Sequence, residues 1–270
     1  MPVSQWSDLE RPPLSAVRLR AILRDDPLWS ALDLRVSTTS TNADVAEAAR
    51  GGRAEGLVVV AEEQAAGRGR LGRQWQAPPR AAVLMSLLVR PELPPQRLPL
   101  LPLLTGVAVV ESTRTVGRVA SALKWPNDVL VSGRKLGGIL VERLDHAVVV
   151  GIGLNVSTRA DELAVPTATS LALEGGTTDR EPIVKELLRA FSRRYRAFVD
   201  ADGAPEAVMP AYRELCETIG TDIRVELPGG RTVIGRAIDV DDGGQLVVEG
   251  PDGATTTWSA GDVTHLRSAG

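Results

Sequence analysis

The segment Gly56-Leu57-Val58-Val59-Val60-Ala61 is followed shortly by Gly67-Arg68-Gly69-Arg70-Leu71-Gly72-Arg73-Gln74-Trp75. The compact apolar run predicts a buried β-strand. In the second segment, three glycines allow the backbone to approach a ligand closely, and three arginines supply guanidinium groups suited to carboxylate or phosphate. The pattern therefore predicts a strand that leads into an anion-binding loop. Taken alone, the loop is equally consistent with a solvated basic segment or a nucleic-acid contact.

The apolar pattern on either side of this segment predicts an α+β domain. Strands are expected at 32–36, 57–61, 83–89, 119–124, 129–131, 136–142 and 147–152, and helices at 14–23, 43–49, 100–115 and from 182 onward. Ser40 and Thr41 are suited to cap the helix at 43–49. Because the last four strands are joined by short turns, we expect a mixed, largely antiparallel sheet with helices on one side.

Composition divides the chain into three parts. Residues 1–31 are marked by prolines and accommodate one helix, 32–219 hold the main α+β domain, and 220–270 alternate short Val/Ile runs with glycine-containing turns. The last pattern is typical of a small β-barrel of tight hairpins. The first part is too short for a winged helix-turn-helix, so we expect no DNA-binding module there.

The overall composition disfavours several classes of protein. A net charge of −3 gives no general electrostatic argument for nucleic-acid binding, and the single Cys216 cannot form an intramolecular disulfide. Cys216 lies in an amphipathic pattern that predicts a thiol packed in the core. No Cys/His spacing is typical of a metal site, and no segment resembles a signal peptide or a membrane span. We therefore expect a soluble, cytoplasmic protein without a membrane partner.

A second group of motifs lies further along the chain. It consists of Lys124-Trp125-Pro126-Asn127-Asp128 and Gly133-Arg134-Lys135-Leu136-Gly137-Gly138-Ile139-Leu140-Val141-Glu142. With Ser40-Thr41-Asn42, Gln64 and Gly151-Ile152-Gly153-Leu154-Asn155-Val156, these segments resemble the motifs of the biotin protein ligases, in the order that the family has them. The resemblance extends from Asp33 to the C-terminus. It implies a class II synthetase-like catalytic domain at 32–219 and an SH3-like domain at 220–270, as in monofunctional ligases that lack the repressor module.

Lysine usage is a further signal, because the chain has only three lysines against 28 arginines. A compact ammonium group enters a narrow pocket and donates in three directions, which a guanidinium fork does not do. Lys124 and Lys135 lie inside the motifs, and we expect a functional role for Lys124. Lys135 is equally consistent with an exposed turn lysine, and Lys185 with a solvated helix face.

The family resemblance also implies roles for individual residues. Lys124 would contact the reacting carboxylate and α-phosphate, and Arg68 and Arg70 would close over the intermediate and exclude water. The implied biotin-binding residues are Ser40, Thr41, Asn42, Gln64, Gly67, Gly69, Gly72 and Gly138. The implied nucleotide-binding residues are Arg70, Arg73, Trp75, Asn127 and Asn155. Leu71 departs from those relatives that have a third consecutive cationic residue in the loop.

The implied reaction has two steps. ATP, accompanied by Mg²⁺, would activate biotin as biotinyl-5′-AMP, and a lysine of a biotin carboxyl carrier protein domain would then take the biotinyl group; no protein ligand to the metal is assigned. The resemblance implies a monomer or weak homodimer with no sequence-specific DNA partner. Two alternatives stay open: a lipoate–protein ligase with the same reaction logic, and a non-catalytic biotin-sensing or phosphate-binding module.

Overall fold

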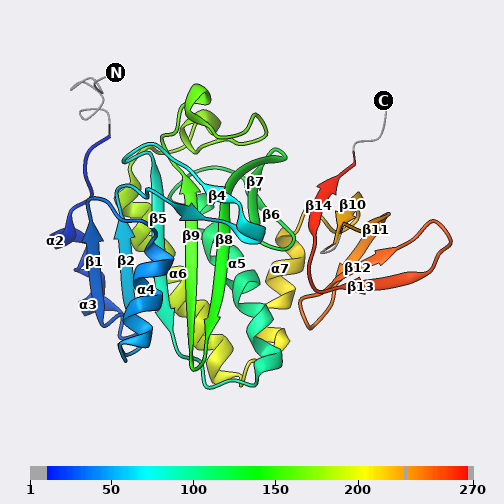
Figure 1. Ribbon diagram of the computed structural model, residues 1–270, viewed down its shortest axis with the longest axis horizontal. Helices are drawn as coiled ribbons and strands as arrows, with labels where there is room; N and C mark the ends of the chain where they lie inside the picture. The colour runs from blue at the N-terminus through cyan, green and yellow to red at the C-terminus, as the bar shows by residue number, and fades with distance from the viewer. Residues whose placement is uncertain (1–10, 228–229, 267–270) are drawn as a thin grey trace.

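The computed structural model of the 270-residue chain describes residues 11–227 and 230–266 (Figure 1). The described residues form a seven-stranded sheet in the order β1 (Ala31–Arg35), β2 (Leu57–Ala61), β5 (Ala82–Val89), β9 (Ala147–Asn155), β8 (Arg134–Leu144), β7 (Asp128–Val131) and β6 (Ser121–Lys124). The pair β1–β2 is parallel and every other pair is antiparallel. The largely antiparallel α+β fold expected from the sequence is confirmed.

Three helices cover one face of this sheet: α5 (Leu101–Thr115), α6 (Arg180–Asp200) and α7 (Met209–Leu215). Asp179 caps the start of helix α6, and its side chain accepts a hydrogen bond from the Glu181 backbone N–H. It buries one apolar stripe, which includes Phe191 and Tyr195 with their rings stacked 5.6 Å apart. The aromatic residues of this stripe are core packing, as their spacing predicts.

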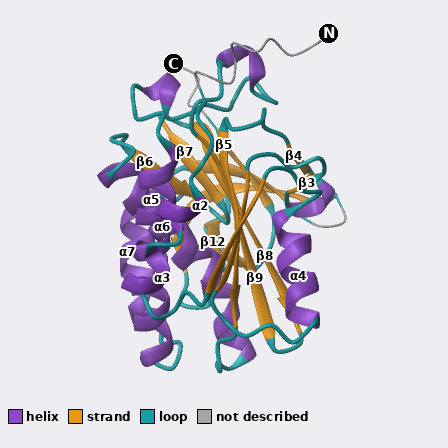
Figure 2. Cartoon of the chain, turned by 90° about the vertical axis from the view of Figure 1, so that its left-hand side faces the viewer, coloured by secondary structure: helices purple, strands orange, loops and turns teal. Residues whose placement is uncertain are grey.

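A further helix, α4 (Thr41–Arg50), lies on the opposite face of the sheet (Figure 2). The expectation of helices on one side alone was therefore incomplete. The reason is that this face of the sheet also carries apolar side chains, and Val45 of α4 packs with Val59 and Val149 in a second, smaller cluster. Helix α4 begins at Thr41, earlier than expected, and Ser40 occupies the N-cap position without a side-chain cap bond.

The single N-terminal helix expected at 14–23 is two short helices, α2 (Ala16–Leu19) and α3 (Ile22–Asp25). The backbone tightens between them, where the Leu23 N–H donates to the Arg20 carbonyl at 3.1 Å. Leu19 and Ile22, three residues apart, lie on the same side of the segment and are both buried in the core. None of the described helices has the length and apolar character needed to cross a membrane.

The C-terminal part forms a five-stranded antiparallel sheet from the described residues. Its strands are β10 (Asp222–Glu226), β11 (Thr232–Val240), β12 (Leu246–Glu249), β13 (Thr255–Trp258) and β14 (Asp262–His265), in the order β13-β12-β11-β10-β14. The indole Nε1 of Trp125 donates to the Gly244 carbonyl at 3.0 Å, and Arg213 of α7 pairs with Asp239 at 2.9 Å. These contacts hold the second sheet beside β6 and bring the start of β14 to the motif residues. Cys216 is buried, as expected for a core thiol.

Candidate active site

The floor of the candidate site is a glycine-lined hollow in β8 and β9. On the face of β9 that α4 covers, Val149 packs against the helix, and Gly151 and Gly153 follow at alternating positions on the same face. A Cβ at Gly151 would lie 2.1 Å from Asn42 Oδ1, and one at Gly153 would lie 2.6 Å from the Trp75 ring. The two glycines therefore leave room for the Asn42 side chain and the Trp75 ring, which any larger residue at these positions would displace.

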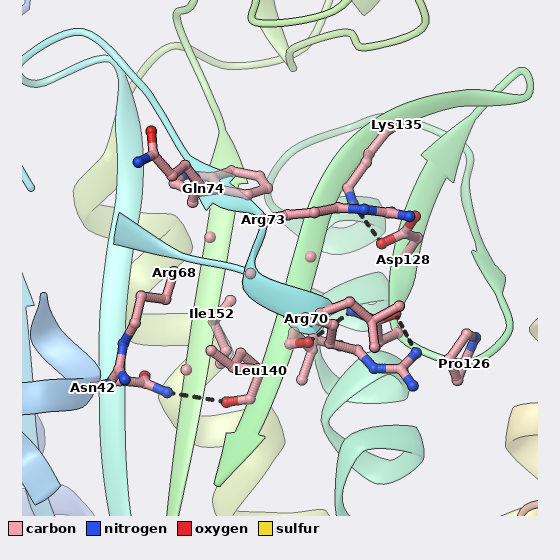
Figure 3. Close-up of a pocket in the computed structure, with 18 of the residues that line it drawn as sticks. Asn42, Arg68, Arg70, Arg73, Gln74, Pro126, Asp128, Lys135, Leu140 and Ile152 are labelled. Atoms are coloured by element: carbon pink, nitrogen blue, oxygen red, sulfur yellow. Dashed lines mark hydrogen bonds and ion pairs between the residues drawn. The ribbon is translucent and has the colours of Figure 1, made fainter. Parts of the chain in front are cut away.

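The arginine loop, residues 67–73, forms the roof of the site. Strands β3 (Gly67–Arg68) and β4 (Gln74–Trp75) pair as a small hairpin, with one turn of 3-10 helix at Arg70–Gly72 between them. The Gly69 N–H closes the hairpin by donating to the Arg73 carbonyl at 2.7 Å. Figure 3 shows this segment crossing above β8 and β9, with its arginines directed to different sides of the hollow.

One end of the cavity is a largely buried network of neutral polar side chains, which is anchored on one carboxylate, that of Glu142. Gln64 Oε1 accepts hydrogen bonds from the Thr41 backbone N–H and hydroxyl at 2.8 and 3.0 Å. The Thr41 and Ser86 hydroxyls are 2.7 Å apart, and Ser86 donates to Asn42 Oδ1 at 2.6 Å. The Asn42 amide in turn donates to Glu142 at 2.6 Å. Because each group is held by another, the network presents fixed donors and acceptors to a ligand.

The other end of the cavity is cationic. Lys135 pairs with Asp128 at 2.6 Å, and Arg70 donates to Asn127 Oδ1 at 3.2 Å. Lys124 lies at the end of β6, and its ammonium group forms no hydrogen bond or ion pair with any residue in 11–227 or 230–266. A half-buried cation without a partner is suited to receive an anionic ligand.

The charges at the cavity are shifted by burial and by each other. Burial lowers the pKa of Lys124 below its usual 10.5, although Asp128 opposes this shift. Burial also lowers the pKa of Arg70. Asp262 lies at the start of β14. Burial alone would raise its pKa, but the hydrogen bond from Arg73 and nearby positive charges outweigh burial, so the pKa is lowered. Of the described lining residues, Arg68, Arg70, Arg73, Lys124 and Lys135 are cationic against Asp128 and Asp262, which favours an anion.

The structure brings most of the expected residues to this cavity. Those that line it are Ser40, Thr41, Asn42, Gln64, Arg68, Gly69, Arg70, Arg73, Trp75, Lys124, Asn127 and Gly138. Gly67 and Gly72 instead border a second hollow, which is lined by the loop, α4 and β8. Asn155 lies outside the cavity lining, buried, with its amide donating to the Thr169 carbonyl at 3.0 Å.

Sequence reasoning missed several residues at the site. Ser86 could have been noticed as a lone hydroxyl in the apolar strand at 83–89. Gly151 and Gly153 lay within a recognised motif and form a Gly-x-Gly pair in an apolar strand, which is a signal of close approach. Asp128 stood in a motif without an assigned role. Asp262 had no local signal, because it reaches the loop from another sheet.

The described residues contain no group of three or more His, Cys, Asp or Glu side chains that could hold a metal ion. The two carboxylates that line the cavity, Asp128 and Asp262, are already paired with Lys135 and Arg73. The donor set therefore does not form a metal cage of its own. It is compatible with a Mg²⁺ ion held mainly by the phosphates of a nucleotide.

Comparison with protein families gives two matches. Residues 35–156 match the Biotin/lipoate A/B protein ligase family, and residues 218–266 match the Biotin protein ligase C terminal domain. The chain is 44% identical to the biotin--[acetyl-CoA-carboxylase] ligase of Mycobacterium tuberculosis, over 96% of this chain and 98% of that protein. It is 34% identical to a bifunctional ligase/repressor of Bacillus subtilis, over 92% of this chain and 78% of that protein.

Solved structures agree with these matches. A biotin protein ligase from Aquifex aeolicus, in complex with biotin and ATP, superposes with a TM-score of 0.74 at 25% identity, over 89% of this chain and 100% of that one. A ligase from Leishmania major in complex with biotinyl-5-AMP superposes with a TM-score of 0.58 at 25% identity, over 85% of this chain and 98% of that one. The matches confirm the resemblance inferred from the motifs.

Proposed function

Because the chain belongs to the biotin protein ligase family, we propose that its cavity activates biotin with ATP as biotinyl-5′-AMP and transfers the biotinyl group to a lysine of a carboxylase carrier domain. The observation that carries this proposal is the arrangement of Lys124. It is a half-buried, unpartnered cation among the described lining residues, next to further cations and at the opposite end from the neutral network around Gln64. This polarity fits a ligand with a neutral, hydrogen-bonding head and an anionic reacting end.

The neutral end suits the biotin ring. The ureido group of biotin has both donors and acceptors, and Thr41, Asn42 and Gln64 have side chains able to meet them. Ser86 fixes the orientation of Asn42 and Thr41 through hydrogen bonds of 2.6 and 2.7 Å. An analogue without the ureido group would lose its hydrogen bonds to these fixed donors and acceptors, so the network supplies selectivity.

In the first step, a biotin carboxylate oxygen attacks the α-phosphorus of ATP, and the bond to the leaving pyrophosphate breaks. Two anions must meet, and negative charge grows on the phosphoryl oxygens. Lys124 and Lys135, from opposite ends of the β6–β7–β8 meander, would place positive charge beside this centre. Their positions are fixed by strand pairing, so little reorganisation is needed at the moment of reaction.

In the second step, the ε-amine of the carrier lysine attacks the biotinyl carbonyl carbon. The bond to AMP breaks, an amide forms, and the amine loses a proton. Between the steps, the mixed anhydride must be shielded from water. The arginine loop would provide this shield, because Arg68 contacts Glu142 at 3.5 Å and Arg70 contacts Asn127 at 3.2 Å on the two sides of the hollow.

The proposal extends to the metal ion and the carrier domain. A Mg²⁺ ion would arrive with the ATP phosphates, where it neutralises charge on the leaving group. The carrier domains would be those of biotin-dependent carboxylases, as the names of the relatives suggest. The individual site roles, a cytoplasmic location, the monomeric or weakly dimeric state and the absence of sequence-specific DNA binding stay predictions.

Pyrophosphate release tests the proposal directly. The pure protein is incubated with ATP, Mg²⁺ and either biotin or lipoate, and then with a carrier domain and its Lys→Arg variant. We expect pyrophosphate with biotin, and labelling of the wild-type carrier alone. Release with lipoate in place of biotin would favour a lipoate ligase, and biotin binding without pyrophosphate would favour a sensing module.

A further inference from the structure

We propose that Asp262 of the C-terminal sheet is a positioning residue that holds the arginine loop closed over the cavity through its ion pair with Arg73. This inference rests on the proposed function, because it concerns how the bound intermediate is retained. It gives the C-terminal sheet a direct part in the site, supplied by a carboxylate that lies far from every ligase motif in the sequence.

The direction of the Asp262 side chain is set by strand pairing. Asp262 opens β14 and pairs with Glu226 of β10. Gly261, which precedes it, packs so closely on β10 that a Cβ there would lie 2.5 Å from Val225 Cγ1. The start of β14 therefore packs directly on the Val225 side chain of β10, with no room for a side chain at position 261, and Asp262 is held in the lining of the cavity.

Arg73 is equally fixed on the loop side. Its carbonyl accepts the hydrogen bond from the Gly69 N–H that closes the hairpin. Its guanidinium meets both carboxylate oxygens of Asp262, with Nη1 to Oδ1 at 3.4 Å and a closer contact between Nη2 and Oδ2. Arg73 thus closes the hairpin through its carbonyl and binds the second sheet through both ends of its guanidinium group.

The three loop arginines differ in what they hold. Arg68 contacts Glu142 and Arg70 contacts Asn127, both in the catalytic domain. Arg73 contacts Asp262 across the junction with the C-terminal sheet. The closed loop is therefore tied at three points, and one tie requires the C-terminal sheet to be in place.

The pair also affects the charge of the site. Asp262 is close enough to Lys124 and Lys135 for their positive charges to stabilise its carboxylate. Asp262 makes its ion pair with Arg73, whereas it acts on the Lys124 ammonium only at longer range, through its charge. Asp262 thus holds the loop closed through Arg73, and the ammonium group of Lys124 stays available for the ligand.

Limited trypsin digestion without substrates tests the latch. In Asp262→Asn, cleavage after Arg68 and Arg70, mapped by mass spectrometry, should be faster by about fivefold, the upper range for a partly exposed ion pair. Asp262→Glu should restore protection. The matched control is Asp239→Asn, which removes one of the two ion pairs that Arg213 of α7 makes with the same C-terminal part. Because the other pair, Arg213–Asp242 at 2.9 Å, keeps the sheet in place, loop cleavage should be unchanged.

The same variants are then loaded with biotin and ATP, and release of biotinyl-5′-AMP is followed after rapid dilution. Release should be about fivefold faster in Asp262→Asn, and Asp239→Asn should match the wild type. Unchanged loop cleavage and release in a folded Asp262→Asn would overturn the inference. If the wild type makes no pyrophosphate, the proposed function fails, whereas the digestion result still decides whether Asp262 holds the loop.

Discussion

The floor of the cavity and the arginine loop above it are both rich in glycine, but for different physical reasons. In the floor, a Cβ at Gly151 would meet Asn42 Oδ1 at 2.1 Å, inside a network held by buried hydrogen bonds. In the loop, Gly67 at the base is also packed, because a Cβ there would lie 2.6 Å from the Trp75 carbonyl oxygen. Beyond it, a Cβ at Gly69 would meet nothing closer than 3.5 Å, and its φ of −114° suits any residue. The difference teaches that the floor is fixed by packing, whereas the loop beyond Gly67 is held by a few side-chain contacts.

A division of labour follows from this difference. The rigid floor and the strand ends beside it set the geometry of the chemical step, which tolerates little displacement. The loop determines how long the intermediate is retained, and its ties are partly exposed and individually weak. Substitutions in the floor should therefore reduce the rate of adenylation, and substitutions in the loop should increase leakage.

The largest effect is expected for Lys124→Arg. The guanidinium is bulkier than the ammonium and donates in a plane, so it cannot reproduce the point charge at the reacting phosphate. Adenylate formation should fall by about two orders of magnitude or more, the scale of removing one well-placed electrostatic donor. The measurement is single-turnover pyrophosphate release, with Lys185→Arg on the outer part of α6 as the control. Near-normal turnover would remove Lys124 from the chemical step.

Gly151→Ala should give the next largest effect. The added methyl group displaces Asn42, whose contacts to Ser86 and Glu142 must then be remade. We expect the KM for biotin to rise by about tenfold to a hundredfold, as misplacement of a binding group by ~1 Å implies. The steady-state KM values for biotin and ATP should be measured together. An equal rise for both substrates would show that the damage is not confined to the neutral end.

The pH dependence of the first step offers a further test of the fixed cation. Burial lowers the pKa of Lys124 below 10.5, so the ammonium is present at low pH and is lost as pH rises through this decreased pKa. The kcat/KM for adenylation should therefore decline at alkaline pH, by about tenfold per pH unit beyond a pKa lower than 10.5. Lys124→Arg should lack this limb, since a guanidinium stays charged. An unchanged limb in that variant would assign the titration to another group.

The same contrast explains which features the sequence could reveal. The strand at 57–61 and the motif around Lys124 were recognised because apolar runs and short motifs are local signals. The face covered by α4 was missed, since periodicity marks an apolar side without saying where it packs. Asp262 is 189 residues from its partner Arg73, and no local pattern links them. Asn155 belonged to a motif, yet its side-chain amide donates to the Thr169 carbonyl and lies outside the cavity lining.

Among loop substitutions, Arg68→Gly should have the largest effect. It removes the contact with Glu142 and one charge from the roof, so the intermediate should escape before transfer. Release of biotinyl-5′-AMP should rise by about tenfold, the scale of losing a hydrogen bond from Arg68 to the charged adenylate, since the exposed contact with Glu142 is itself weak. Escaped adenylate should label lysines of a bystander protein indiscriminately, which streptavidin blotting would detect. Arg68→Lys, which keeps the charge, should leak less; equal leakage would argue against an electrostatic hold.

The smallest effect is expected for Gly69→Ala, which is the loop counterpart of Gly151→Ala. The backbone of Gly69 lies in an extended region open to any L-residue, and the nearest atom to the new methyl group would be the Arg73 carbonyl oxygen at 3.5 Å. This is an ordinary van der Waals contact, so activity and adenylate release should change by no more than about twofold, as for most exposed substitutions. Both constants should be measured beside those of Gly151→Ala. If Gly69→Ala instead costs as much as Gly151→Ala, the ligand must approach the loop backbone at Gly69, and the roof would share the steric precision that we assign to the floor.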